Sequence, residues 1–262
     1  MLSCMADNGL TGPCIGLIWD GTGLGTDSTI WGAECLAGDA HSFNRLGSIS
    51  PIRLPGGDAC ARDPGRIAHS LLVEAGLEEQ STAHQAQLLT MQLTAGLNCP
   101  PASSMGRLFD GVYALLGGSS PVHYEGESAI RLEHMAQAGI TQSLPVEVET
   151  VDGVCRLIAP ALTAALMERK AAGDSPHLLA AQFMNAMVEL AVKQCQFARK
   201  HTGLNRVVLS GGVFQNMYLL PRILDALAAQ GFRAYHHSRV STNDEGIALG
   251  QLIAAAARRK EG

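Results

Sequence analysis

Residues 207–216, Val-Val-Leu-Ser-Gly-Gly-Val-Phe-Gln-Asn, constrain the fold of this chain more than any other stretch. The apolar run at 207–209 is typical of a buried strand, and it ends abruptly in Ser210, Gly211 and Gly212. Two adjacent glycines allow the backbone to turn sharply and to approach a ligand without an intervening Cβ atom. The helical pattern that begins near residues 215–216 adds unpaired backbone N–H groups and the positive end of a helix dipole. The segment predicts a strand-to-helix turn of an α/β protein and leaves open whether that turn binds a phosphate.

The overall composition indicates a globular protein with a sizeable core. Of the 262 residues, 47% are apolar and 16% are charged, and a chain of this length can form one large domain or two lobes. The net charge of −5 argues against a nucleic-acid binder that depends on a basic face, and no apolar run reaches membrane-spanning length. The seven cysteines never form a C-x-x-C pair. We therefore expect a cytoplasmic protein with reduced thiols and with no nucleic-acid or membrane partner.

Strand and helix patterns predict an α/β fold in two lobes. The expected strands cover residues 14–19, 29–36 and 232–236, and the segments 51–66 and 98–106 are expected to be largely loops. The expected helices cover residues 66–96, 107–116, 125–138, 175–200, 215–230 and the terminal segment from 243, with a kink or break at Pro221. We assign residues 1–140 to a partial first lobe, 141–174 to a connecting segment, and 175–262 to a second lobe with the phosphate loop and the terminal helix.

The longest predicted helix carries the clearest local signals. Ser175 is an expected N-cap, Pro176 suits the first helical position, and Gly203 is expected to end the helix. Apolar side chains recur at helical spacing along one expected buried stripe, namely Leu179, Phe183, Met187 and Leu190.

Asp20 ends the first predicted strand and begins the segment Asp-Gly-Thr-Gly-Leu-Gly-Thr-Asp-Ser. Its glycines follow a G-x-G-x-G spacing, and the chain continues into a strand rather than a helix, so this is no Rossmann fingerprint. In the functional interpretation, the Asp20 carboxylate binds a metal or a metal-bound phosphate, and Gly21 and Gly23 let backbone N–H groups meet phosphate oxygens. A glycine-rich hairpin without a ligand is the alternative.

Two further aspartates have both a structural and a functional interpretation. Asp244 begins the last predicted helix, where it either caps the helix or acts as a metal ligand. Asp110 either forms a local cap or ion pair with Arg107 or points at a nucleotide ribose. The nine histidines show no metal-binding spacing, and strand alternation should send the adjacent pair at 236–237 to opposite faces. The residues alone leave these alternatives open.

Six segments of this chain occur in the order found in one known family. They are DGTGLGTDSTIWGAECL at 20–36, LPGGD at 54–58, ASSMGRLFD at 102–110, YEGESAIRLE at 124–133, LSGGVFQN at 209–216 and NDEGIALGQ at 243–251. In these segments the chain resembles the HypF family, the carbamoyltransferases of nickel–iron hydrogenase maturation. The resemblance covers nearly the whole chain.

The resemblance implies an actin-like ATPase fold of the type shared with the tRNA threonylcarbamoyl-transferring TsaD proteins. It also implies that ATP or carbamoyl-adenylate is the bound nucleotide. The carbamoyl group, activated in an upstream YrdC-like domain, would pass to the C-terminal cysteine of a HypE-like acceptor for cyanide-ligand synthesis. By motif, Asp20 and Asp244 would bind a divalent metal, which is Mg, Fe or Zn. The nucleotide would be bound by Gly21, Gly23, Asp110, Gly126, Ser210, Gly211, Gly212 and Asn216, with Asp110 and Gly126 near its ribose.

The chain also departs from the family pattern. It lacks the YrdC-like and acylphosphatase-like domains, the C-x-x-C zinc motifs, and a histidine motif that supplies two metal ligands just upstream of the segment matching residues 2–10. Glu245 stands where the family usually has glycine, and Met184 stands where it commonly has histidine. We therefore expect an incomplete metal site that suits Mg²⁺ better, and no full activity from the chain alone. The alternatives are a non-catalytic interaction module, half of a split enzyme, or a small-molecule O-carbamoyltransferase.

Overall fold

The centre of the fold is a sheet in which two distant parts of the chain pair side by side. The structure, a computed structural model, describes residues 1–259. Strand β1 (Cys14–Leu24) forms an antiparallel hairpin with β2 (Ile30–Gly38), and its other edge pairs in parallel with β8 (Arg206–Ser210). The pairing of β1 with β8 ends at Ile18 opposite Ser210, whereas β1 continues beside β2 to Leu24, so Asp20 lies in a strand and not in the predicted loop, close to the turn that follows Ser210.

The remaining strands extend this sheet on both sides. The path runs β6-β7-β3-β2-β1-β8-β9, with β5 pairing to β2 and β4 pairing to β5. Their bounds are β3 (Phe43–Ile49), β4 (Ile52–Arg53), β5 (Pro101–Ser104), β6 (Val148–Val151), β7 (Val154–Leu157) and β9 (Arg233–His236). The three strands predicted at 14–19, 29–36 and 232–236 are all present.

Helix α8 (Pro176–Thr202) forms the main cover on one face of the sheet. The predicted stripe is confirmed, because Leu179, Phe183, Met187 and Leu190 are all fully buried. The Ser175 hydroxyl accepts a hydrogen bond from the Leu178 N–H at 3.2 Å, and the chain leaves the helix through Gly203 at φ +73°. Both predicted ends of this helix are therefore correct to within two residues.

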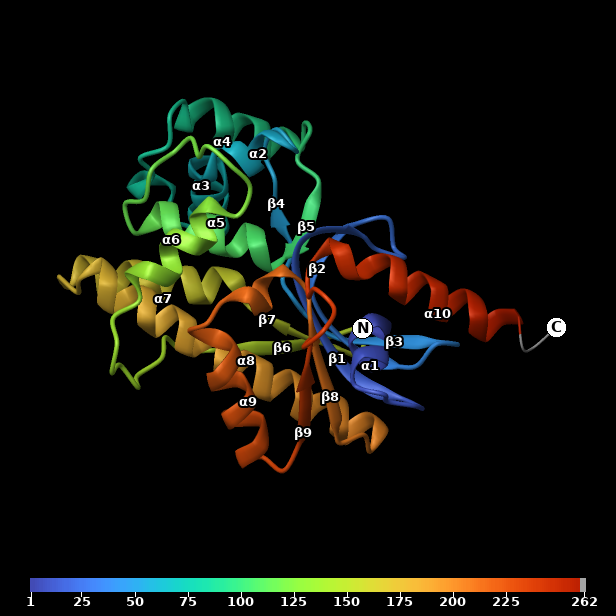
Figure 1. Ribbon diagram of the computed structural model, residues 1–262. Helices are drawn as coiled ribbons and strands as arrows, with labels where there is room; N and C mark the ends of the chain where they lie inside the picture. The colour runs from blue at the N-terminus through green and yellow to red at the C-terminus, as the bar shows by residue number, and fades with distance from the viewer. Residues whose placement is uncertain (260–262) are drawn as a thin grey trace.

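The other helices lie on three sides of the sheet, as Figure 1 shows. Helix α9 (Leu219–Ala229) packs beside α8, whereas α1 (Leu2–Asp7) and α10 (Ile247–Arg259) pack against each other on the opposite face. A further group gathers beyond β4 and β5, consisting of α2 (Ala59–Arg62), α3 (Pro64–Glu74), α4 (Ala86–Ala95), α5 (Met105–Leu115) and α6 (Glu127–Met135). Helix α7 (Ala159–Ala171) packs against α3 and α8.

Several local expectations were wrong. The segments 51–66 and 98–106 are not simply loops, since they contain β4, α2 and β5, and these short strands exist because they pair with distant partners. The helix expected from 215 begins only at Leu219, after a 3₁₀ turn at Gly212–Gln215. Pro221 therefore lies in the first turn of α9. Backbone N–H groups in the first turn form no hydrogen bond within the helix, so a residue without an N–H group is tolerated there and does not interrupt α9.

Residues 141–174, expected to connect two lobes, carry regular structure of their own. They contain β6, β7 and α7, and β7 pairs in parallel with β3, with Gly47 opposite Cys155. The sheet thus continues through this segment, while the lobe boundaries themselves stay a prediction. Within residues 1–259, no helix is both long enough and apolar enough to cross a membrane.

Candidate functional site

A cavity of about 470 Å³ opens where β1 and β8 end. Side chains alternate across a strand, so Ile18 and Asp20 of β1 and Glu34 of β2 line this cavity, while Trp19, Ala33 and Cys35 lie in the core on the other face. Further walls come from the last residues of β1 (22–24), from residues 1–3, from residues of and after β2, from the turn at Ser210 and Gly211, and from the segment 242–250 that leads into α10. The cavity therefore joins both ends of the chain sequence in one site.

Gly211 makes the sharp turn that follows β8, and no other residue type fits there. Its backbone has φ +106° and ψ 157°, and a Cβ atom at this position would lie 2.7 Å from the carbonyl carbon of Trp19. The Gly211 N–H donates to the Thr242 carbonyl at 2.9 Å, and the Thr242 hydroxyl donates to the Gly211 carbonyl at 3.1 Å. These bonds fix the turn against the segment that leads into α10.

Asp20 lies directly beside this turn. Its Oδ1 atom accepts a hydrogen bond from the Gly21 N–H at 2.8 Å, and a Cβ atom on Gly212 would lie 3.2 Å from the same oxygen. A side chain at 212 would crowd the carboxylate, which gives a physical reason for the second glycine. The Cα of Gly21 is packed in turn against Gly106, whose Cβ would lie 2.9 Å from it. The backbone around Asp20 is thus closely enclosed.

Asp244 reaches the same cavity, but it does not cap the helix. The Asn243 side chain takes that role, because its Oδ1 accepts from the Glu245 N–H at 3.1 Å and from the Ser241 hydroxyl at 2.6 Å. The structural alternative for Asp244 is therefore wrong by one residue. Its carboxylate is exposed and has no hydrogen-bond partner among residues 1–259.

Asp20 and Asp244 are oxygen donors, and the part of the chain that the structure describes holds no group of three or more His, Cys, Asp or Glu side chains placed to bind one metal ion. Two carboxylates with room for water and phosphate oxygens fit Mg²⁺, which keeps several waters and needs few protein ligands. They fit iron or zinc less well, since these metals favour imidazole or thiolate.

His237 is a neighbour of the site that the sequence analysis considered only as one of an adjacent histidine pair and did not place beside Ser210. Its Nε2 lies 2.9 Å from the Ser210 Oγ, and burial lowers the pKa of His237, which favours the neutral ring. Strand β9 pairs with β8 so that Leu209 faces His236, and this register places the next residue beside Ser210. The contact depends on this register of β8 and β9, for which the local sequence carries no signal.

Comparison with known proteins assigns the chain to a family. A family profile described as "Carbamoyltransferase, Kae1-like Domain, second subdomain" matches residues 16–251. The carbamoyltransferase HypF homolog of Cupriavidus necator is 37% identical over 271 residues, which cover 96% of this chain and 67% of that protein. The chain belongs to the HypF carbamoyltransferase family.

Other HypF proteins are longer than this chain. Carbamoyltransferase HypF2 of Cupriavidus necator is 34% identical over 97% of the chain, which spans only 35% of that protein's length. A crystal structure of full-length HypF in the phosphate- and nucleotide-bound form matches with a TM-score of 0.91 and 35% identity, covering 97% of this chain and 41% of that one. The HypF structure of T. kodakarensis matches with a TM-score of 0.81 and 27% identity, over 96% of this chain and 34% of that one. These matches confirm the predicted α/β, actin-like, Kae1/TsaD-like fold.

The HypF motifs do not all meet at the cavity. Among the predicted residues, Asp20, Gly23, Ser210, Gly211 and Asp244 line it, while Gly21 and Gly212 adjoin Asp20. Gly126 lies elsewhere, as the left-handed residue at φ +80° that precedes α6.

Asn216 has a structural role in α9. Its Oδ1 accepts from the Leu219 N–H at 2.9 Å and from the Tyr218 N–H at 3.0 Å, and its Nδ2 faces the Met184 sulfur at 3.9 Å. The side chain is buried and lies outside the cavity lining.

Asp110 is also buried, inside the group of helices beyond β5. Arg107 Nη2 lies 3.1 Å from Asp110 Oδ2, so the local ion pair considered from the sequence is present. Burial raises the pKa of Asp110 to about 6, and the positive charge of Arg107 only partly opposes this effect.

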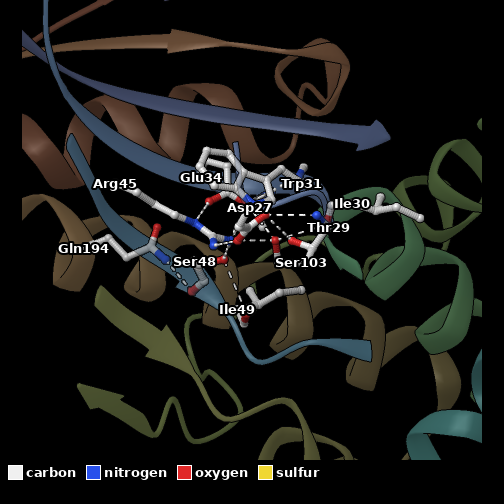
Figure 2. Close-up of polar contacts among 12 residues, drawn as sticks. Asp27, Thr29, Ile30, Trp31, Glu34, Arg45, Ser48, Ile49, Ser103 and Gln194 are labelled. Carbon is white, nitrogen blue, oxygen red and sulfur yellow. Dashed lines mark hydrogen bonds and ion pairs between the residues drawn. The ribbon is translucent and has the colours of Figure 1, made fainter. Parts of the chain in front are cut away.

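Glu34 brings an acid to the cavity wall that the sequence did not mark as functional. Figure 2 shows Arg45 bridging it to its surroundings. Arg45 Nε lies 2.5 Å from Glu34 Oε2, and Arg45 Nη2 lies 3.1 Å from Glu34 Oε1. The guanidinium also donates to the hydroxyls of Ser48 and Ser103 at 2.8 and 2.9 Å, and it stacks 4.1 Å from the centre of the Trp31 ring.

Proposed function

We propose that the cavity at the ends of β1 and β8 binds the phosphate groups of an adenine nucleotide, as the Kae1-like part of a carbamoyltransferase. The observation that carries this proposal is the convergence of Asp20, Ser210, Gly211 and Asp244, from two ends of the sequence, on one cavity. Backbone turns without Cβ atoms and adjacent carboxylates suit a phosphate with a divalent cation. A HypF relative with a TM-score of 0.91 was crystallised in a phosphate- and nucleotide-bound form.

The cation that fits this donor set is Mg²⁺. Asp20 and Asp244 would hold it, and when bound it neutralises negative charge on the phosphate. Asp20 is itself positioned by the Gly21 N–H at 2.8 Å and by the close approach of Gly212. The protein thus supplies a fixed carboxylate on one side of the cavity and an exposed carboxylate on the other.

The reaction we propose is transfer of a carbamoyl group from carbamoyl-adenylate to the terminal cysteine of a HypE-like protein. A thiolate of the acceptor attacks the carbamoyl carbon and forms a C–S bond. The bond from that carbon to the phosphate oxygen breaks, and AMP leaves with the electron pair. In this step the cavity binds and orients the adenylate, and its donors stabilise the charge that develops on the leaving phosphate.

The cysteines of this chain support an acceptor thiol from another protein. All seven are free, and Cys99 alone among them is not buried. Burial raises the pKa of Cys4 to about 11 and that of Cys60 to about 12, so these thiols stay protonated near neutral pH. Free thiols throughout also support our proposal of a cytoplasmic location.

Calorimetry tests the nucleotide site directly. ATP titrated into the chain with Mg²⁺ should give a saturable heat, and Asp20→Asn should weaken binding roughly ten-fold by removing a fixed charged ligand. Asp225→Asn, an exposed change on α9, is the matched control and should bind like the unchanged protein. No heat at millimolar ATP would overturn the proposal.

The acceptor is tested separately. The chain would be combined with a YrdC-like protein, carbamoyl phosphate and ATP, and then offered either a peptide with a C-terminal cysteine or a small-molecule alcohol. We expect a carbamoylated peptide by mass spectrometry. Carbamoylation of the alcohol alone would favour an O-carbamoyltransferase.

A further inference from the structure

Glu34 creates an electrostatic problem for a cavity that receives phosphate. It lies on the same face of the sheet as Asp20, it lines the cavity, and it is only 3% exposed. A buried carboxylate repels an anion across a low-dielectric site more strongly than a solvated one does. Together with Asp20, Asp39 and Asp244, it makes four acidic side chains in the cavity lining, and no lysine or arginine among residues 1–259 lines the cavity.

Arg45 lies directly behind this acid and contacts both of its oxygens, as Figure 2 shows. Its own side chain is 16% exposed, and its guanidinium is further held by the Ser48 and Ser103 hydroxyls. A bidentate arginine on a buried carboxylate is a strong, geometrically fixed pair. The positive charge is therefore held at Glu34 and does not enter the cavity.

A second acid completes the arrangement on the solvent side. Asp27 Oδ2 lies 3.3 Å from Arg45 Nη1, and Asp27 Oδ1 accepts from the Trp31 indole at 2.9 Å. The Asp27 side chain is 44% exposed, so solvent screens its charge far more than that of Glu34. The electrostatic potential that this network produces in the cavity therefore comes mainly from the buried pair of Glu34 and Arg45.

We propose that Arg45 is a positioning residue for anion binding, which neutralises Glu34 at the wall of the nucleotide cavity. This inference rests on the proposed function, and it assigns a specificity role to two residues outside the predicted ligand set. It makes a prediction that a purely structural pair does not make. The two single substitutions should change anion affinity in opposite directions.

The test measures binding of AMP by calorimetry in metal-free buffer, so that no cation compensates the charges. Arg45→Gln should bind AMP roughly ten-fold more weakly, since it exposes the ligand to an unpaired Glu34. Glu34→Gln should bind AMP several-fold more tightly, because it leaves the positive charge of Arg45 without its counter-ion. Arg45→Lys keeps the charge but not the fork geometry, and it should stay within about three-fold of the unchanged protein.

Two further variants keep the test decisive. Arg45→Gln leaves a buried carboxylate unpaired and can prevent folding, so the double variant Glu34→Gln with Arg45→Gln is included and should return to the original affinity. Arg169→Gln, which removes an equal charge at the far end of α7, is the control and should change nothing.

If Glu34→Gln binds AMP more weakly than the unchanged protein or equally well, the inference is wrong. If the unchanged protein binds neither AMP in metal-free buffer nor ATP in the presence of Mg²⁺, the proposed nucleotide site itself is wrong.

Discussion

The cavity at the ends of β1 and β8 and the buried surroundings of Asp110 and of Asn216 use their polar side chains in opposite ways. At the cavity, the Asp244 carboxylate is exposed and unpartnered among the described residues, and one Asp20 oxygen is held by a neighbouring N–H. At the two buried positions, the Asn216 oxygen caps α9 and Asp110 lies against Arg107. The cavity residues and the two buried residues all belong to family motifs. The contrast shows that a motif can preserve the scaffold as well as the site.

The largest effect expected is at the turn beside the cavity. Gly211→Ala should destabilise the fold by about 3 kcal/mol or more, because its Cβ would overlap the Trp19 backbone at a φ of +106°. Urea unfolding monitored by circular dichroism measures this loss. Gly231→Ala is the control, since Gly231 has φ +77° and no atom of residues 1–259 would lie within 4 Å of the added Cβ, and it should cost only about 1 kcal/mol. Equal losses of unfolding free energy at the two positions would show that the positive φ angle, rather than the close approach of the Trp19 backbone, requires glycine at position 211.

The next effect concerns Asp110 and has a defined pH dependence. Its folded-state pKa of about 6 lies above the ordinary value of 3.8, so the folded state binds more protons between these pH values. The contribution of Asp110 to the free energy of unfolding is therefore fully present below its unfolded-state pKa, and it is lost as the pH rises through the folded-state pKa of about 6. Relative to Asp110→Asn, the unchanged protein should lose roughly 2 kcal/mol of unfolding free energy from pH 4.5 to 7.5. Parallel stability curves for the two proteins would contradict the burial argument.

A smaller effect tests whether Asn216 belongs to the scaffold. Asn216→Ala should lower the unfolding free energy by about 1 kcal/mol through loss of the α9 cap, whereas Asn216→Asp keeps the accepting oxygen and most of the stability. Both can be measured by urea unfolding alongside ATP titration. If an Asn216 variant loses ATP binding but keeps its stability, Asn216 contributes to the nucleotide site rather than to the fold.

The smallest effect separates two adjacent residues at the start of α10. Asp244→Asn should change stability by less than about 0.5 kcal/mol, since its side chain is exposed, while Asn243→Ala should cost about 1 kcal/mol as the true cap. Thermal unfolding of the two variants gives the comparison. If Asp244→Asn lost more stability than Asn243→Ala, Asp244 would be the helix cap, and its carboxylate would not be available to bind a cation.

The sequence predicted the parts of the fold that local patterns control. Helix α8 has its N-cap, its buried stripe and its terminal glycine at the expected positions, because each signal acts within a few residues. Strand β5 and the pairing of β7 with β3 were missed, because a four-residue strand is stabilised by partners far away in sequence.

The same distinction applies to the candidate site. The turn at Gly211 could be predicted, since two glycines after an apolar run are a local signal. The contact of Ser210 with His237 and that of Glu34 with Arg45 could not, because each depends on the register of neighbouring strands. Spacing along the chain likewise could not distinguish Asn216, which caps α9, from Asp244, whose carboxylate has no hydrogen-bond partner within residues 1–259.

The parallel pairing of β1 with β8 also has a consequence for biosynthesis. Ile15 of β1 pairs with Val207 of β8, and the ribosome synthesises Val207 about 190 residues later. The outer edge of β1 therefore has no strand to pair with until β8 has left the ribosome. An apolar strand with an open edge is prone to pair with other chains during that interval. We expect a nascent chain stalled before β8 to associate with chaperones or to aggregate, and a chain extended through α9 to be released.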